Sequence, residues 1–313
     1  MNDVRYIEIN PEEEGQRLDN YLIRILKGVP KSHIYRIIRA GEVRVNKKRA
    51  KPDTRLIAHD RVRIPPIRLS TEKQIVVGTR LSDQLLGCII YEDEQLLIVN
   101  KPSGLAVHGG SGLSLGLIEG FRKLRADLSY LELVHRLDKE TSGCLMLAKK
   151  RSMLRSLQAQ FESRRVKKTY WALLAHSWVG KNTAMVDRAL EKNTLKSGER
   201  MVRVNEEGKA SQTVFRLLEN FNDACWVEAM PKTGRTHQIR VHSAYLGHPI
   251  LGDEKYGGAT TGVDLSAMKK RLYLHARAIQ FNLNGKDFEF VAELDDHFEQ
   301  ALAIFRAQKL NCS

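Results

Sequence analysis

Strand-like segments follow one another along most of this 313-residue chain, and their succession constrains the fold more than any other feature. Runs rich in β-branched, aromatic and aliphatic residues are typical of strands. Helical patterns separate only some of these runs, whereas parallel strands need a crossover connection, usually a helix. The sequence therefore predicts an α+β fold with a mixed, largely antiparallel sheet. The expected strands lie at 95–101, 143–150, 168–176, 211–220, 224–230, 271–281 and 287–294, and the expected helices at 152–162, 236–245 and 296–308.

The first 75 residues have a different pattern, which predicts a separate small α+β domain. One helical pattern, at 15–28, ends at Gly28, and a second begins with Ser32 as its N-cap and ends at Gly41. A short hairpin with its turn at 46–48 follows. Consecutive prolines, Pro65 and Pro66, end this pattern because proline cannot continue the interior of a sheet. We expect domains at 1–75 and 89–313, joined by a linker at 76–88.

Positive charge is concentrated in the expected N-terminal domain. The chain carries a net charge of +14, and the stretch 17–68 supplies +11 of it, with 15 Lys or Arg against four acids. Such a concentration is typical of a domain that binds a polyanion, although a basic face can also serve only solubility. The segment resembles the small RNA-binding module of a primary small-subunit ribosomal protein and of several RNA-modifying enzymes. Its candidate RNA-binding residues are Arg36, Arg39, Arg44, Lys47, Lys48, Arg49 and Lys51.

Several classes of protein are disfavoured by composition. The N-terminus lacks a basic segment leading into an apolar one, and no run of 18 apolar residues occurs, so we expect neither targeting nor a membrane span. His237 and His242 are five residues apart and would point in different directions on a strand or a helix, so we expect no metal site. The cysteines show no CxxC spacing, which favours a reduced, cytoplasmic protein; they are Cys88, Cys144, Cys225 and Cys312.

One acid, Asp138, lies between Arg136 and Lys139 in the stretch ELVHRLDKETSGC, before an apolar strand. By itself, such an aspartate could cap a turn or form a surface ion pair. A rival site lies upstream, where GLSLG, residues 112–116, matches the G-x-S-x-G pattern that places Ser114 as a hydrolase nucleophile. That pattern requires a strand running into the serine, and here a loop precedes it.

Four separated segments agree with one another and give Asp138 a more specific context. NKPSGLAVHGGSG, ELVHRLDKETSG, KTYWAL and PKTGRTHQIRVHSAYLGHPILGDEKYG together resemble the RluA family of pseudouridine synthases. With the basic N-terminal domain, the resemblance covers essentially the whole chain. It implies the pseudouridine synthase fold for the larger domain and a single essential aspartate, which corresponds to Asp138.

The resemblance also implies roles for three further residues. Arg235, the first arginine of GRTHQIR, would pair with Asp138 and keep it ionised; Tyr170 would lie against the target base; and Arg136 would fill the space left by a flipped nucleotide. From the residues alone, both arginines could equally contact phosphates, and Tyr170 could be a core residue of a strand. Isomerisation of uridine needs no redox change and no outside nucleophile, so we expect no cofactor and no metal.

We therefore expect a monomeric enzyme that isomerises uridine in large-subunit ribosomal RNA or its assembly precursor. Three alternatives stay open: an RNA-binding assembly factor with a silent active site, a serine hydrolase that uses Ser114, and the same isomerase acting on a different RNA.

Overall fold

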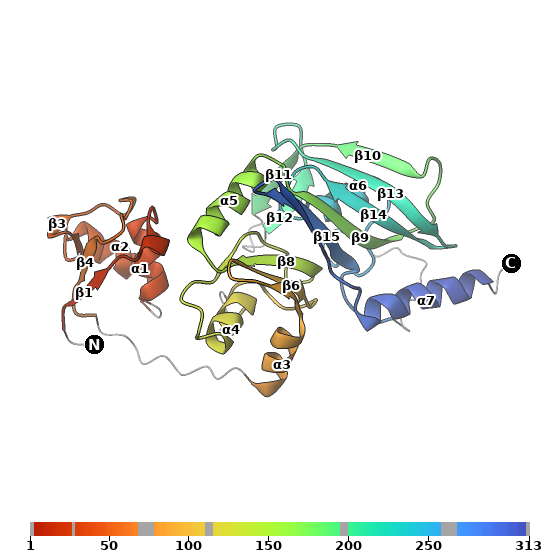
Figure 1. The fold of residues 1–313 in the computed structure, drawn as a ribbon. Coiled ribbons are helices and arrows are strands. Elements are labelled where there is room, and N and C mark those ends of the chain that lie inside the picture. The colour runs from red at the N-terminus through yellow and green to blue at the C-terminus, as the bar shows by residue number, and fades with distance from the viewer. Residues whose placement is uncertain are drawn as a thin grey trace. The chain divides into compact units, whose positions relative to one another are not determined.

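The computed structural model describes residues 3–26, 29–67, 78–109, 115–194, 200–257 and 268–310. The chain divides into two compact units, the first made mainly of Met1–Val77 and the second mainly of the chain from Gly78 onward. The order of the elements is shown in Figure 1.

The first unit packs two helices on a small antiparallel sheet of strand order β1-β4-β2-β3. Its core forms where the apolar stripe of each helix meets the other and the sheet, with Leu18 and Leu22 from one helix and Ile34 and Ile38 from the other. The elements are β1 (Arg5–Glu8), the 3-10 helix η1 (Pro11–Glu13), α1 (Leu18–Ile25), α2 (Lys31–Arg39), β2 (Arg44–Val45), β3 (Lys48–Arg49) and β4 (Arg61–Ile64).

The structure confirms most of the local features predicted for this unit. Gly41 follows α2 with φ +74°, as expected for a glycine that ends a helix. The hairpin turn is made by Asn46 and Lys47, whose φ values of 50° and 68° match a turn that favours the twist of the strands. The predicted N-cap is wrong, because Pro30 occupies that position and Ser32 lies inside the helix. Gly28 lies outside the described residues.

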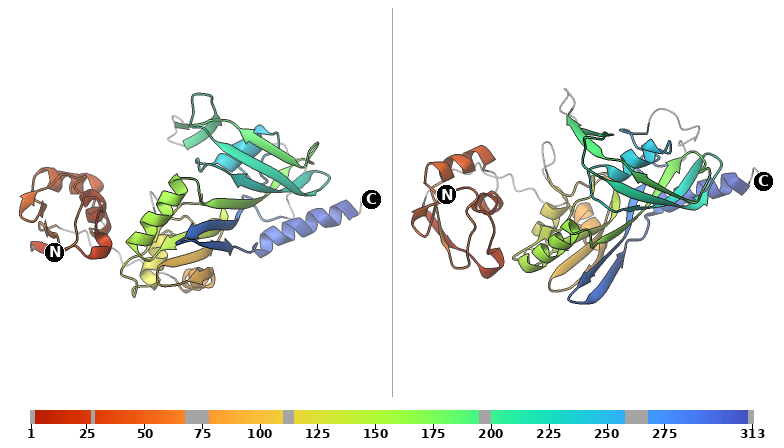
Figure 2. Two further views of the ribbon diagram at one scale, coloured as in Figure 1. Left: turned by 45° about the horizontal axis from the view of Figure 1, so that its top comes forward. Right: turned by 90° about the horizontal axis from the view of Figure 1, so that it is seen from above.

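The second unit is built on a ten-stranded sheet whose main path runs β10-β13-β14-β9-β15-β8-β6-β5. The pair β15 and β8 is parallel, and the other described pairs in this sheet are antiparallel, so the predicted α+β fold with a mixed, largely antiparallel sheet is confirmed. The two views in Figure 2 show helices beside this sheet. Its strands are β5 (Ile89–Glu92), β6 (Leu96–Lys101), β7 (Glu132–Leu133), β8 (Ser142–Ala148), β9 (Lys167–Ala175), β10 (Thr183–Asp187), β13 (Gln212–Asn220), β14 (Ala224–Pro231), β15 (Leu274–Leu283) and β16 (Lys286–Val291), and a separate hairpin joins β11 (Leu190–Thr194) to β12 (Arg200–Val204).

Helices bury both faces of the strands at one end of this sheet. Alternate residues of β6 point to opposite sides: Leu97 and Val99 enter one core, and Leu96 and Ile98 enter the other. The first core includes residues of α3 (Thr79–Gly87) and α4 (Leu117–Leu124), and the second includes residues of α5 (Arg151–Glu162). A third core joins β9, β13 and β14 to α6 (Gln238–Tyr245) and α7 (Asp296–Leu310).

Helix α3 occupies most of the expected linker at 76–88, which corrects the predicted boundary. Leu85 is fully buried and packs with Leu117 and Phe121 of α4, so this segment belongs to the larger unit. The apolar stripe of α3 consists of few residues in a polar sequence, so the pattern of this helix is weak. The prolines upstream suggest a linker, and the predicted linker therefore extends over the helix.

Candidate active site

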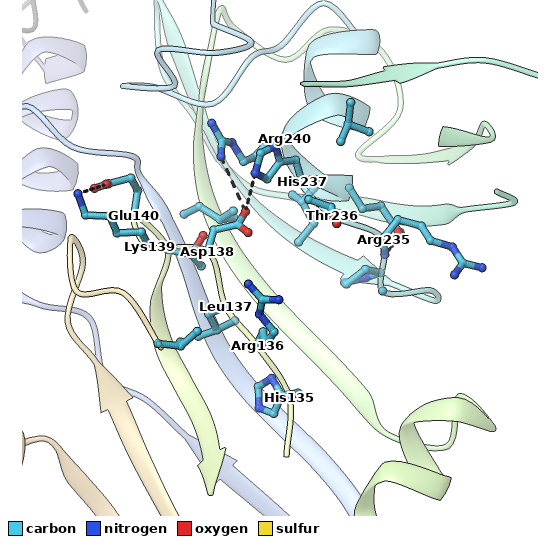
Figure 3. A pocket seen from close by; sticks show the side chains of 18 of the residues that line it. His135, Arg136, Leu137, Asp138, Lys139, Glu140, Arg235, Thr236, His237 and Arg240 are labelled. Carbon is cyan, nitrogen blue, oxygen red and sulfur yellow. Dashed lines mark hydrogen bonds and ion pairs between the residues drawn. The ribbon is translucent and has the colours of Figure 1, made fainter. Parts of the chain in front are cut away.

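Asp138 lies in a pocket of about 830 Å³ within the second unit, close to the centre of the sheet. The pocket is lined mainly by four segments that are far apart in sequence: residues 106–109, the loop before β8, the start of β9, and the turn that leads into α6. The hairpin of β11 and β12 adds Lys192 and Val202 to its wall. Figure 3 shows Asp138 with the side chains around it.

The loop that carries Asp138 is held at both ends by the sheet. β7 and β8 form a short antiparallel pair on either side of it, and the amide N–H of Thr141 donates to the carbonyl oxygen of Asp138 at 3.2 Å. Gly143, in the TSG that follows, has φ +107°, and a Cβ atom there would lie 2.3 Å from the carbonyl oxygen of Ala276. Only glycine allows β8 to approach β15 this closely, which fixes where the loop ends.

Two donors of the α6 region face the Asp138 carboxylate (Figure 3). His237 Nε2 is 3.7 Å and Arg240 Nη1 is 3.8 Å from Asp138 Oδ2. The Asp138 side chain is 34% exposed, whereas that of Arg240 is 8% exposed. A buried cation therefore stands behind a carboxylate whose remaining surface is open to the pocket, which suits a charge that acts on a bound molecule.

The structure places Arg240, and not the predicted Arg235, beside the Asp138 carboxylate. Arg235 lines the same pocket, but its guanidinium points away from Asp138 in Figure 3 and Nε donates to the carbonyl oxygen of Ala210 at 3.2 Å. His237, with φ 52°, lies between them in the left-handed conformation and turns the chain into α6. Because of this turn, the side chains of Arg235 and Arg240 point in different directions.

Tyr170 lies in β9 and lines the pocket with its ring packed against apolar residues of two cores. Burial raises the pKa of its phenol well above the usual range, and the nearby negative charge of Asp138 raises it further. Tyr170 is therefore a protonated phenol at neutral pH, placed within the electrostatic reach of the carboxylate.

Arg136 is exposed and lines the pocket two residues before Asp138, as Figure 3 shows. Because it is exposed, Arg136 is available to a molecule that enters the pocket. Its place is consistent with both readings of the sequence, a phosphate contact and a residue that fills the space of a flipped base.

A fully buried lysine and a half-buried lysine near the site were not predicted. Lys101, at the end of β6, is fully buried and donates from Nζ to the carbonyl oxygens of Pro102, Leu105 and Lys139 at 2.8–2.9 Å. Lys168 lines the pocket and donates to the carbonyl oxygen of Thr233 at 3.2 Å. Burial lowers the pKa of Lys168 to about 8. The strand period of two could have placed Lys168 beside Tyr170.

The chain is similar over nearly its whole length to curated pseudouridine synthases. It is 50% identical over 311 residues to the ribosomal large subunit pseudouridine synthase C of Pasteurella multocida, covering 98% of this chain and 95% of that one. It is 48% identical over 310 residues to the protein of the same name from Escherichia coli K12, covering 97% of each. The family model of RNA pseudouridylate synthase matches residues 95–245, and that of the S4 domain matches residues 16–63.

The chain belongs to the RNA pseudouridylate synthase family. A solved structure titled human RNA pseudouridylate synthase domain containing 4 shares the fold, with a TM-score of 0.61 and 28% identity over 72% of this chain and 96% of that one. As a member of this family the protein is an enzyme, an isomerase that converts uridine in RNA to pseudouridine. The predicted resemblance is confirmed for both units.

The remaining predicted residues fall on the first unit or outside the described chain. The candidate RNA-binding residues of the first unit are all exposed: Arg36, Arg39, Arg44, Lys47, Lys48, Arg49 and Lys51. Ser114, the alternative nucleophile, lies outside the described residues. In the part of the chain that the structure covers, three or more His, Cys, Asp or Glu side chains do not gather into a group able to hold a metal ion. The described helices are each too short or too polar to cross a membrane.

Proposed function

We propose that this pseudouridine synthase modifies specific uridines of large-subunit ribosomal RNA and that Asp138 carries out the chemistry. The proposed substrate is supported by the 48–50% identity, over nearly the full length, to enzymes named for the large ribosomal subunit. The observation that supports Asp138 is its place in a pocket, with a half-buried carboxylate and a buried arginine beside it.

The isomerisation breaks the bond between the sugar C1′ and N1 of uracil, turns the base, and forms a bond between C1′ and C5. The proton on C5 then leaves and N1 gains one, so the atoms and electrons balance without an oxidant or a reductant. We propose that the Asp138 carboxylate supplies the negative charge at the sugar or the base. Because no step needs a redox group, we propose that the reaction uses neither cofactor nor catalytic metal.

A uridine stacked inside folded RNA cannot reach this pocket, so it must be flipped out at a cost of a few kcal/mol. We propose that Arg136, exposed at the pocket, occupies the space that the base leaves, and that Tyr170 stacks on the flipped base. Because the pKa of Tyr170 is raised, its side chain is a protonated phenol and not a phenolate base. We therefore propose that the hydroxyl organises the removal of the C5 proton and does not accept this proton as a phenolate. Arg235, on the same pocket wall and turned away from Asp138, is suited to a phosphate.

We propose that the basic residues of the S4 domain hold the surrounding RNA, and that one chain acts alone in the cytoplasm. The exposed cations of the hairpin β2–β3 support the first part, because phosphate contacts need side chains that solvent can reach.

Mapping pseudouridines in ribosomal RNA tests this proposal. Cells that lack the protein should lose pseudouridine at discrete positions of large-subunit RNA, and these should return with the wild-type gene but not with Asp138→Asn. Return of the same positions with the Asn variant would contradict the role of Asp138. Loss confined to another RNA would keep the chemistry and overturn the substrate. Unchanged pseudouridines together with defective ribosome assembly would support the silent assembly factor.

A further inference from the structure

The segment from Gly252 to Gly257 lies directly behind the two groups that face Asp138. Asp253 is buried and accepts two hydrogen bonds from Arg240, from Nε to Oδ2 and from Nη2 to Oδ1, both at 2.7 Å. With these two nitrogens engaged, Arg240 presents Nη1 to Asp138 at 3.8 Å. A planar guanidinium held at two points cannot rotate without losing both bonds.

Tyr256 contacts the other group, His237, through its hydroxyl. The phenol oxygen accepts a hydrogen bond from the backbone N–H of Val202 at 3.0 Å and lies 2.8 Å from His237 Nδ1. Because the Val202 N–H can only donate, the hydroxyl proton of Tyr256 is available for His237 Nδ1. The imidazole proton then resides on Nε2, the nitrogen that is 3.7 Å from Asp138 Oδ2.

The ring of Tyr256 contacts both Arg240 and His237. The Arg240 guanidinium lies over it, with 5.1 Å from Cζ to the ring centroid, and the His237 ring meets it edge to face at 5.6 Å. Phenylalanine at this position would keep both ring contacts and lose only the hydroxyl.

The backbone of the segment is itself fixed. The amide N–H of Leu251 donates to the carbonyl oxygen of Leu173 in β9 at 2.9 Å, and the N–H of Tyr273 donates to Leu251 at 3.0 Å. Gly252 has φ +73°, and a Cβ atom there would lie 1.7 Å from the carbonyl oxygen of Arg271. The segment is thus tied to the central sheet just before Asp253.

We propose that Asp253 and Tyr256 are positioning residues, which orient Arg240 and His237 so that each presents one N–H to the Asp138 carboxylate. This inference rests on the proposed role of Asp138. The two donors stabilise the negative charge of Asp138. Because they lie 3.7 and 3.8 Å away, they leave the carboxylate oxygens open to the substrate. Released from Asp253, the Arg240 guanidinium could turn and bind both oxygens of Asp138, which would hold the carboxylate away from the nucleotide.

A double-mutant cycle between Tyr256 and His237 tests the proposal. Tyr256→Phe should lower the single-turnover rate of pseudouridine formation about tenfold, roughly the effect of one hydrogen bond, while RNA affinity stays within about twofold. In the His237→Ala background, the same substitution should have no further effect, because the hydroxyl acts through the imidazole. Equal losses in both backgrounds would overturn the proposal.

Tyr245→Phe is the matched control, since Tyr245 lies on α6 and its exposed hydroxyl accepts a hydrogen bond from Arg188 Nε at 2.8 Å. A Tyr256→Phe enzyme as fast as this control would also overturn the proposal. Asp253→Asn, which removes the charge but keeps the shape, should slow turnover without weakening RNA binding.

A spectroscopic measurement on the free full-length protein keeps the test independent of activity. The ¹⁵N resonance of His237 Nδ1 should shift in Tyr256→Phe, as expected when a nitrogen loses a hydrogen-bond donor, and stay in place in Tyr245→Phe. An unmoved resonance in Tyr256→Phe would contradict the inferred hydrogen bond. Turnover by Asp138→Asn, in contrast, would overturn the proposed mechanism and leave the result for Tyr256 unaffected.

Discussion

The Asp138 carboxylate is exposed on one side and faces charged and polar donors on the other, and this asymmetry bears directly on its chemistry. Arg240 and His237 lie at distances too long for strong hydrogen bonds, so they lower the energy of the charge without occupying the oxygens. Burial lowers the pKa of His237, against the opposing influence of the Asp138 charge. The lowered pKa of His237 favours its neutral imidazole, and Arg240 supplies the positive charge beside Asp138.

We expect Asp138→Asn to reduce turnover below detection while RNA affinity changes less than about threefold, because the amide keeps the shape and loses the charge. Single-turnover formation of pseudouridine and a binding isotherm measure the two quantities. Ser114→Ala should retain normal turnover. Loss of activity in the Ser114 variant with activity kept in Asp138→Asn would favour the hydrolase alternative.

We expect Tyr170→Phe to preserve RNA binding and to block a late step of the reaction, the loss of the C5 proton. Stacking on a base is worth about 1–3 kcal/mol and depends on the ring, which phenylalanine keeps. The hydroxyl is needed when the proton leaves C5 after the new bond has formed. Tritium release from C5-labelled uridine under single-turnover conditions should therefore fall at least tenfold in Tyr170→Phe. Equal release rates in the two enzymes would leave Tyr170 with a stacking role alone.

At the scale of elements, Lys101 ties the end of β6 to the loop that carries Asp138. Its Nζ donates to carbonyl oxygens of the segment after β6 and of Lys139, next to Asp138. Burial lowers the pKa of Lys101 to about 7, whereas three carbonyl acceptors need the three protons of the charged form. The contacts outweigh the cost of burial only while all three acceptors stay in place.

Lys101→Met should therefore lower the free energy of unfolding by about 3 kcal/mol, since it leaves buried carbonyl oxygens without a donor. Urea denaturation of the full chain measures this loss. Lys286→Met, at an exposed position of β16, is the control and should change stability by less than about 0.5 kcal/mol. Equal stability of the two variants would show that water replaces the Lys101 contacts.

Most of the longer strands and helices could be predicted from the sequence, but α4, with Leu117, Ile118 and Phe121 fully buried, was not, and neither were the short strands β5, β7 and β10. The seven expected strands and three expected helices of the larger unit all occur, with ends shifted by a few residues. The hairpin of β11 and β12 was missed because its residues are mostly polar, and α3 because few of its residues are buried. The choice between Arg235 and Arg240 depends on the left-handed turn at His237, which no periodicity reveals.

Most of the net positive charge lies in one unit of the molecule, and the pocket with Asp138 lies in the other. The stretch 17–68 supplies +11 of the net charge of +14, whereas the pocket with Asp138 lies entirely in the unit that begins at Gly78. The turn and second strand of the hairpin β2–β3, with the two residues that follow, carry four exposed cations, Lys47, Lys48, Arg49 and Lys51, and none of them forms an ion pair with an acid among the described residues. Such cations are available to phosphates, and binding through them releases counterions from the RNA.

Replacing these four residues with glutamine, at Lys47, Lys48, Arg49 and Lys51, should weaken RNA binding and flatten its salt dependence. Each lost phosphate contact reduces the slope of log affinity against log salt by about 0.7, so four contacts predict a change of about 3. Single-turnover rates at saturating RNA should stay near wild type, because the pocket is untouched. The control replaces four exposed lysines of the larger unit that lie outside the pocket, Lys181, Lys209, Lys270 and Lys286. Equal slopes for the two variants would show that the hairpin contributes only general positive charge.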